Sequence, residues 1–218
     1  YIPTKYEIFD TLEFLFQKIS TPSDGFYHPF CRHYHLNFAK DNVAKMEFSN
    51  EINGLFATTS MVYEFNPTNG HVETIVGEET KQLINSALTG KMMDAQYHQM
   101  LETACVQITN FRLDVAYQAL EKLWDAYERL KCYFDPKNQK DKSVSAARIV
   151  ELFGDNEFFQ TQISEEMHKI TLLGNNLRIR HSETYQSVLT NHRQIHYLFR
   201  RCLALIVLIQ DQIVASNV

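Results

Sequence analysis

Apolar residues recur at steps of three and four along most of the chain, which is the spacing of one helix face. The clearest case is the stretch 110–134, where the step is unbroken through Leu113, Ala116, Leu120, Leu123, Tyr127, Leu130 and Phe134. The same spacing predicts helices over 6–19, 41–57, 78–88, from 92 or 94 to 109, from 143 or 145 to 153, 157–180 and 191–214. In the last helix we expect Ile195, Phe199, Cys202, Ile206, Ile209 and Ile213 to face inward.

The pattern changes in two places of the N-terminal third. Two short apolar runs, 60–65 and 71–76, flank Asn66-Pro-Thr-Asn-Gly70, which predicts a β-hairpin with Gly70 at a positive φ. The stretch 26–38 is rich in aromatic residues and His and shows no clean period. We interpret it as a partly exposed loop or strand. Asp41 is a plausible N-cap at the start of the predicted helix 41–57. In this helix we expect Val43, Phe48, Ile52, Leu55 and Phe56 to face inward.

These elements predict a mainly α protein in two parts. Residues 1–77 form a small α+β unit that ends in the hairpin, and residues 78–218 form a helical bundle. The low content of turn residues, 7 Gly and 5 Pro in 218 residues, agrees with long helices and excludes most all-β folds.

Composition restricts the cellular location and the kinds of partner that we expect for the protein. The four cysteines are far apart and contain no CxxC pair, so we expect free thiols and a cytoplasmic location. The longest apolar run has eight residues, whereas a membrane span needs about 20. We therefore expect no membrane association. The formal net charge of −5 argues against a nucleic-acid-binding surface that covers the whole chain.

One segment departs from this acidic average. Residues 171–201 contain five Arg and one acidic residue, a local charge of +4, so the remainder carries −9. The segment includes Gly174 followed by two adjacent Asn, which are poor helix formers inside an otherwise regular helix. Such local inconsistency is expected at functional or strained sites.

The residue types of this segment suit phosphate chemistry. His181 could act as a general acid or base, and Arg178 and Arg180 could bind a phosphate and stabilise charge on its oxygens. Asn175 and Asn176 could orient a hydroxyl or phosphate oxygen. The competing interpretation is structural, because Arg and His near a helix C-terminus also favour the helix dipole and bond to the last carbonyls.

Here the sequence resembles a known family. The stretch 175–183, Asn-Asn-Leu-Arg-Ile-Arg-His-Ser-Glu, followed by 197–206, is similar to the C-terminal half of HEPN (higher eukaryotes and prokaryotes nucleotide-binding) domains of bacterial abortive-infection proteins. The upstream residues 119–130 fit the same pattern, and the likeness covers roughly 110–214. A weaker likeness, over 52–56, 62–65 and 70–73, links the N-terminal part to the helix-plus-hairpin module of some abortive-infection proteins.

The HEPN resemblance implies a helical bundle that dimerises and cleaves RNA in a shared cleft without metal. The family motif is an Arg, a polar residue that is often Asn, and a His after four to six intervening residues. His181 matches the His and Asn176 matches the polar residue, while Asn175 stands where the family has Arg. Arg178 and Arg180 lie nearby and are the candidates to replace it.

Two functional hypotheses follow. The first is a metal-independent endoribonuclease effector of a bacterial abortive-infection or toxin-like system, with catalytic residues Asn175, Asn176, Arg178, Arg180 and His181, and RNA-binding residues His192, Arg193, Arg200 and Arg201. The second is a catalytically silent HEPN-like module that acts through RNA or protein contacts. Both predict a homodimer, RNA as partner, an antitoxin or other defence protein as a candidate partner, and no cofactor or metal.

Other constellations carry weaker signals. Cys31, His33 and His35 would share one face of a strand, with His28 nearby, and this pattern could hold zinc only with a further ligand. His192 and His196 lie one helical turn apart but lack a third ligand. A winged-helix reader built from residues 41–76 is disfavoured, because the hairpin carries no Lys or Arg.

Overall fold

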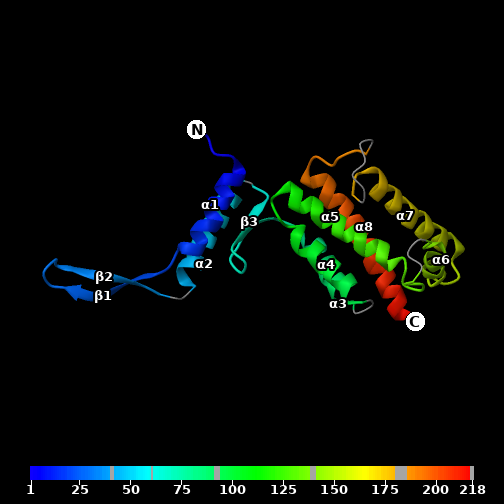
Figure 1. Cartoon of the computed structure of the whole chain (residues 1–218), viewed down its shortest axis with the longest axis horizontal. Helices are drawn as coiled ribbons and strands as arrows, with labels where there is room; N and C mark the ends of the chain where they lie inside the picture. The colour runs from blue at the N-terminus through cyan, green and yellow to red at the C-terminus, as the bar shows by residue number, and fades with distance from the viewer. Residues whose placement is uncertain (40–41, 60, 91–93, 138–140, 180–185, 217–218) are drawn as a thin grey trace. The chain divides into compact units, whose positions relative to one another are not determined.

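The computed structural model (Figure 1) describes residues 1–39, 42–59, 61–90, 94–137, 141–179 and 186–216. Its fold is mainly α, as the sequence predicts. The chain divides into two compact units, Tyr1–Ile75 and Val76–Val218, each with its own core. In the described part of the chain, no helix combines the length and the apolar character that crossing a bilayer requires.

The described residues of the first unit form two helices and two hairpins. Its elements are α1 (Lys5–Lys18), β1 (Pro22–His28), β2 (His33–Phe38), α2 (Val43–Thr58), β3 (Tyr63–Asn66) and β4 (His71–Thr74). Helix α1 begins with a capping box, in which the Thr4 side chain accepts from the Glu7 N–H and the Glu7 carboxylate accepts from the Thr4 N–H.

Phenylalanine side chains make the core of this unit. Phe9, Phe16, Phe56 and Phe65 are buried, and the Phe16 and Phe65 ring centroids lie 5.1 Å apart. Val43 and Leu55, which the helical spacing placed inward, are 54% and 61% exposed. Helix α2 packs against α1 and the β3–β4 hairpin through a narrow face that includes Phe56, so Val43 and Leu55, at the edges of the predicted stripe, stay exposed.

The predicted hairpin is present as β3–β4, and Gly70 has a φ of +74°. A Cβ at this glycine would stand 2.8 Å from the Phe16 ring, so both the turn and the core require glycine here. Asn53 of α2 fixes the hairpin to the helix, since its side chain accepts from the Phe65 N–H at 2.6 Å and donates to the Phe65 carbonyl at 3.0 Å.

The aromatic and His-rich stretch forms a second hairpin, β1–β2, with a register irregularity between Asp24 and Tyr27. Its residues are exposed along nearly the whole length of both strands. Neither face packs on a core, and this explains why the sequence shows no alternation of apolar and polar residues. The connection between the strands contains Cys31, which is exposed, whereas Cys105, Cys132 and Cys202 are buried.

The second unit is a helical bundle. Its helices are α3 (Glu78–Thr89), α4 (Ala95–Gln107), α5 (Leu113–Leu130), α6 (Ser143–Glu151), α7 (Glu157–Asn176) and α8 (His192–Ala215). Helix α5 runs beside α8, and its fully buried residues include Leu120, Leu123 and Trp124. The six α8 residues predicted to face inward are all buried.

Helix α7 lies antiparallel to α5, because bonds join Tyr127 to the Met167 carbonyl and Tyr117 to the Leu177 carbonyl. It ends at Asn176, four residues before the predicted end. Arg178 adopts a φ of +56°, in the left-handed region where a helix cannot continue. The remaining predicted helix ends differ from the observed ones by a few residues.

Candidate functional site

The predicted site residues lie around the connection from α7 to α8. Asn175 and Asn176 are the last residues of α7, and Arg178 follows two residues later. His192, Arg193, Arg200 and Arg201 lie in the N-terminal half of α8. Arg180 and His181 lie outside the described residues.

The glycine before the two asparagines has a packing role. A Cβ on Gly174 would stand 2.3 Å from Nε1 and 2.4 Å from Cδ1 of the Trp124 indole. The indole N–H donates to the Ile170 carbonyl at 3.1 Å, and Trp124 is fully buried. Gly174 therefore lets the flat indole lie directly against the α7 backbone. The inconsistency in the sequence marks a close helix–helix approach at this position.

Three hydrogen bonds to backbone carbonyl groups hold the end of α7. The side-chain amide of Asn176 donates to the Leu172 carbonyl at 2.9 Å, and the Asn176 carbonyl accepts from the Ser187 N–H at 3.1 Å. The buried Gln186 side chain donates to the Asn175 carbonyl. These bonds fix where the chain leaves α7 and where it returns. The side-chain amide nitrogen of Asn176 is thus engaged in a hydrogen bond within the last turn of α7.

Arg178 presents a cation just beyond this helix end. Its side chain is exposed, and its positive charge acts to lower the pKa of Tyr117 and the pKa of Glu121, both on α5. Burial, together with the nearby Asp125, raises the pKa of Glu121, while the charges of Lys122 and Arg178 act in the opposite direction. Arg178 forms no ion pair with any described carboxylate.

The arginines of α8 differ in how their charge is balanced. Arg193 and Arg200 are exposed and pair with no carboxylate in the part of the chain that the structure describes. Arg201 instead binds Glu166 of α7 with two bonds of 2.7 and 2.8 Å. This contact lowers the pKa of Glu166 and raises that of Arg201. Glu166 thus offsets one charge of the basic segment.

His192 and His196 lie side by side on α8, with ring centroids 6.0 Å apart. Burial, followed by the charges of His192 and Arg200, lowers the pKa of His196 to about 4, although a bond to the Ile108 backbone acts against the shift. His196 is therefore a neutral imidazole at neutral pH, and it contributes no positive charge to the basic segment.

The His196 shift predicts how stability depends on pH. A His in the unfolded chain titrates near 6.5, whereas His196 in the folded chain titrates near 4. Between these values the unfolded state binds a proton that the folded state lacks, so the free energy of unfolding falls as the pH is lowered from 6.5 towards 4. Because the ring is only partly buried, we expect a loss of about 1–2 kcal/mol.

Urea denaturation of the wild type and of His196→Gln between pH 7 and pH 4 measures this effect. The substitution should flatten the pH dependence by that amount. His168→Gln, at an exposed position on α7, should keep the wild-type slope. Equal slopes in wild type and His196→Gln would show that His196 titrates alike in both states.

Sequence reasoning missed several residues that shape this region. Glu166 of α7 binds Arg201, which lies 35 positions later in the chain. Tyr117 and Gln186 bond to carbonyls of residues that are remote in sequence. A single sequence carries no signal for such pairs. The buried position of Gln186 could not be inferred from its residue type either.

Comparison with known proteins gives one family. Residues 1–89 match the family described as AbiJ N-terminal domain 4, a match that covers the first unit and α3. No curated protein and no solved structure matches the chain. The match confirms the abortive-infection resemblance for the N-terminal part. The N-terminal region of this chain is therefore similar to an N-terminal domain of an abortive-infection protein.

Proposed function

We propose that the chain is an RNA-acting effector of a bacterial abortive-infection system and that its activity is metal-independent endoribonuclease cleavage. The match of residues 1–89 supports the biological setting. The HEPN resemblance of 110–214 supports the chemistry. The observation that carries the proposal is the set of three exposed arginines, Arg178, Arg193 and Arg200, which pair with no described carboxylate around the α7–α8 connection.

In this proposal the arginines bind the RNA backbone and His181 transfers the proton. A guanidinium can bind two phosphate oxygens at once and stabilise the charge that develops on them. The substrate's own 2′-hydroxyl attacks the adjacent phosphorus and gives its proton to His181, while the bond from phosphorus to the 5′-oxygen breaks and the leaving oxygen takes up a proton. The reaction therefore requires an acid–base group and no metal. Arg178 is the described arginine nearest in sequence to His181, and we assign it to the scissile phosphate.

An RNA cleavage assay in EDTA tests the proposal. We expect the wild type to cleave single-stranded RNA, and His181→Ala to lose about 10²–10⁴-fold in rate, which is the usual contribution of a general acid or base. Arg178→Ala should also lose activity. Lys169→Ala, which removes an exposed cation of α7 that pairs with Glu165, is the matched control and should cleave normally. Unchanged cleavage by His181→Ala would remove the assignment.

A second function is favoured by one specific observation. Asn175 stands where the resembled family has Arg, and its backbone carbonyl is held by Gln186 in the fold of the α7 terminus. A module without that guanidinium would bind RNA or a protein partner without turnover. In that case we expect no cleavage, together with binding that weakens as salt rises. Loss of one phosphate-binding arginine, in Arg193→Ala or Arg200→Ala, should lower the salt slope by about 0.7 on a single strand.

Both functions assume a homodimer, which is the arrangement that the HEPN resemblance implies. Light scattering at micromolar concentration measures the oligomeric state directly. A monomer would remove the shared-cleft arrangement, while leaving single-chain RNA binding as the remaining form of the second function.

A further inference from the structure

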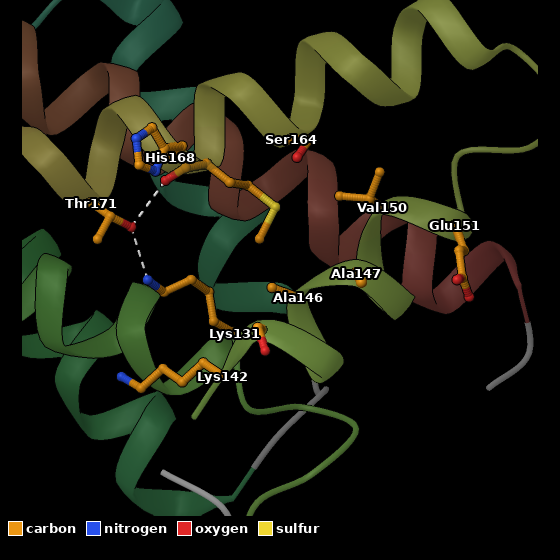
Figure 2. A pocket seen from close by; sticks show the side chains of 11 residues that line it. Lys131, Lys142, Ala146, Ala147, Val150, Glu151, Ser164, His168 and Thr171 are labelled. Carbon is orange, nitrogen blue, oxygen red and sulfur yellow. Dashed lines mark hydrogen bonds between the residues drawn. The ribbon is translucent and has the colours of Figure 1, made fainter. Parts of the chain in front are cut away.

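A hollow with a volume of about 600 Å³ lies between α6 and α7, and none of its lining residues is among those assigned to RNA (Figure 2). Its wall is mainly apolar and includes Ala146, Ala147 and Val150 of α6 and Met167 of α7. This volume is within the range of about 300–1,000 Å³ that is typical of small-molecule sites. An apolar hollow with a few polar groups is the usual form of such a site.

Two lysines at one end of the hollow share one carboxylate. Glu128 lies 2.7 Å from the Lys131 ammonium and 2.6 Å from that of Lys142. The three side chains are little exposed, at 8% for Glu128, 10% for Lys131 and 22% for Lys142. The formal charges of this cluster sum to +1. An ammonium group in a poorly solvated place is stabilised by an anion that approaches it.

The two lysines are held differently. Lys131 donates to the Thr171 hydroxyl at 2.9 Å, and this hydroxyl donates to the Met167 carbonyl at 3.0 Å, as Figure 2 shows. Lys142 has Glu128 as its one hydrogen-bond partner among the described residues. An ammonium group carries three donors. Lys142, which lines the hollow, therefore retains donor capacity for a ligand.

The opposite end of the hollow has the opposite character. Glu151 lies at the far side of the hollow from Lys131 and Lys142 (Figure 2). The apolar side chains of α6 lie between these two ends. The hollow therefore favours an anionic group at the lysine end only, and a second anionic group at the Glu151 end would be repelled.

We propose that this hollow binds a small ligand with a single anionic group and an apolar body. The anionic group lies at Lys142, where it accepts the hydrogen bonds that this ammonium group can still donate. The apolar body lies against Ala146, Ala147, Val150 and Met167. This site shares no lining residue with the proposed RNA site, and the inference does not depend on the proposed RNA chemistry.

Titration calorimetry of the whole protein with octanoate tests the proposal, and octylammonium and octanol provide the same body with a different head group. We expect octanoate to bind and to raise the melting temperature by mass action, while the other two do neither. Lys142→Met should weaken octanoate binding at least tenfold, and Lys142→Arg should retain it. Ala147→Phe, at an exposed position, fills the hollow without touching the ion cluster and should abolish binding.

Each other outcome overturns the proposal. Equal binding of octanoate and octanol would show an apolar surface without recognition of charge. Octanoate binding that survives in Ala147→Phe would place the ligand elsewhere. Inorganic phosphate that binds as tightly as octanoate would show a surface anion site with no role for the hollow. Circular dichroism of each unliganded variant confirms that the fold is kept.

Discussion

Glu128→Gln should lower the free energy of unfolding by about 3–5 kcal/mol, the largest effect that we expect from a single substitution here. Glutamine keeps the size of the side chain but removes the charge that Lys131 and Lys142 share. Both ammonium groups would then remain in a poorly solvated place without their counter-ion. Urea denaturation followed by circular dichroism measures the change.

The same helix provides the control. Asp125 pairs with Lys122 at 3.7 Å on an exposed face, where both side chains are nearly half exposed. Asp125→Asn removes a carboxylate from the same helix and should change stability by less than about 1 kcal/mol. The double variant Glu128→Gln/Lys142→Met removes one of the stranded charges and should recover part of the loss. Equal effects of Glu128→Gln and Asp125→Asn would mean that solvent screens the Glu128 cluster.

Gly174→Ala should be destabilising although alanine is the better helix former. The exchange improves helix propensity by about 1 kcal/mol. The new methyl group, however, would stand 2.3 Å from the Trp124 indole nitrogen, well inside contact distance. To make room, the buried indole must move and lose its bond to the Ile170 carbonyl. Overpacking of this kind costs about 1–3 kcal/mol, to which the lost bond adds, and we expect a net loss of about 2 kcal/mol.

Gly54→Ala is the matched test of this reasoning. Gly54 lies inside α2, and a Cβ there meets no atom within 4 Å. The same exchange should therefore stabilise the protein, by about 0.5–1 kcal/mol. Chemical denaturation of both variants shows directly whether each substitution raises or lowers the free energy of unfolding. If Gly174→Ala were also stabilising, the close approach of α5 and α7 would be relaxed in solution.

The sequence predicted those parts of the fold in which a helix covers a large core. Helix α8 is the best example, because its predicted inward residues, from Ile195 to Ile213, are all buried. In the first unit the same reasoning placed Val43 and Leu55 inward, although both are exposed. Periodicity indicates which residues share a face, but the width of the buried stripe depends on what packs against it.

The end of α7 shows a second limit. Periodicity extended the helix to 180, whereas tertiary bonds end it at Asn176. The Tyr117 hydroxyl, 60 residues earlier in the chain, donates to the Leu177 carbonyl, and Ser187 returns to bond with Asn176. A helix end that is fixed by distant residues leaves no local capping signal. The unusual Gly-Asn-Asn sequence did mark the position, but its glycine serves the contact with Trp124.

The positive charges of the candidate site could be predicted from the sequence. The carboxylate that pairs with one of them could not. The arginine-rich segment is visible in the composition, and Arg178, Arg193 and Arg200 are exposed. The partner of Arg201 lies on another helix and could not be read from the segment itself. The roles of Arg180 and His181 stay predictions, which the RNA cleavage assay addresses.

The tip of the β1–β2 hairpin offers a means of attaching probes to the first unit. Burial raises the pKa of the Cys105 thiol to about 12 and that of Cys202 well above its ordinary value, and Cys132 is buried as well. Cys31 is exposed in the turn between the two strands. Since a thiol must be accessible to react, we expect a maleimide dye to attach at this turn in the native protein. A single label at a known position, with no engineered cysteine, then makes fluorescence anisotropy and energy-transfer measurements possible.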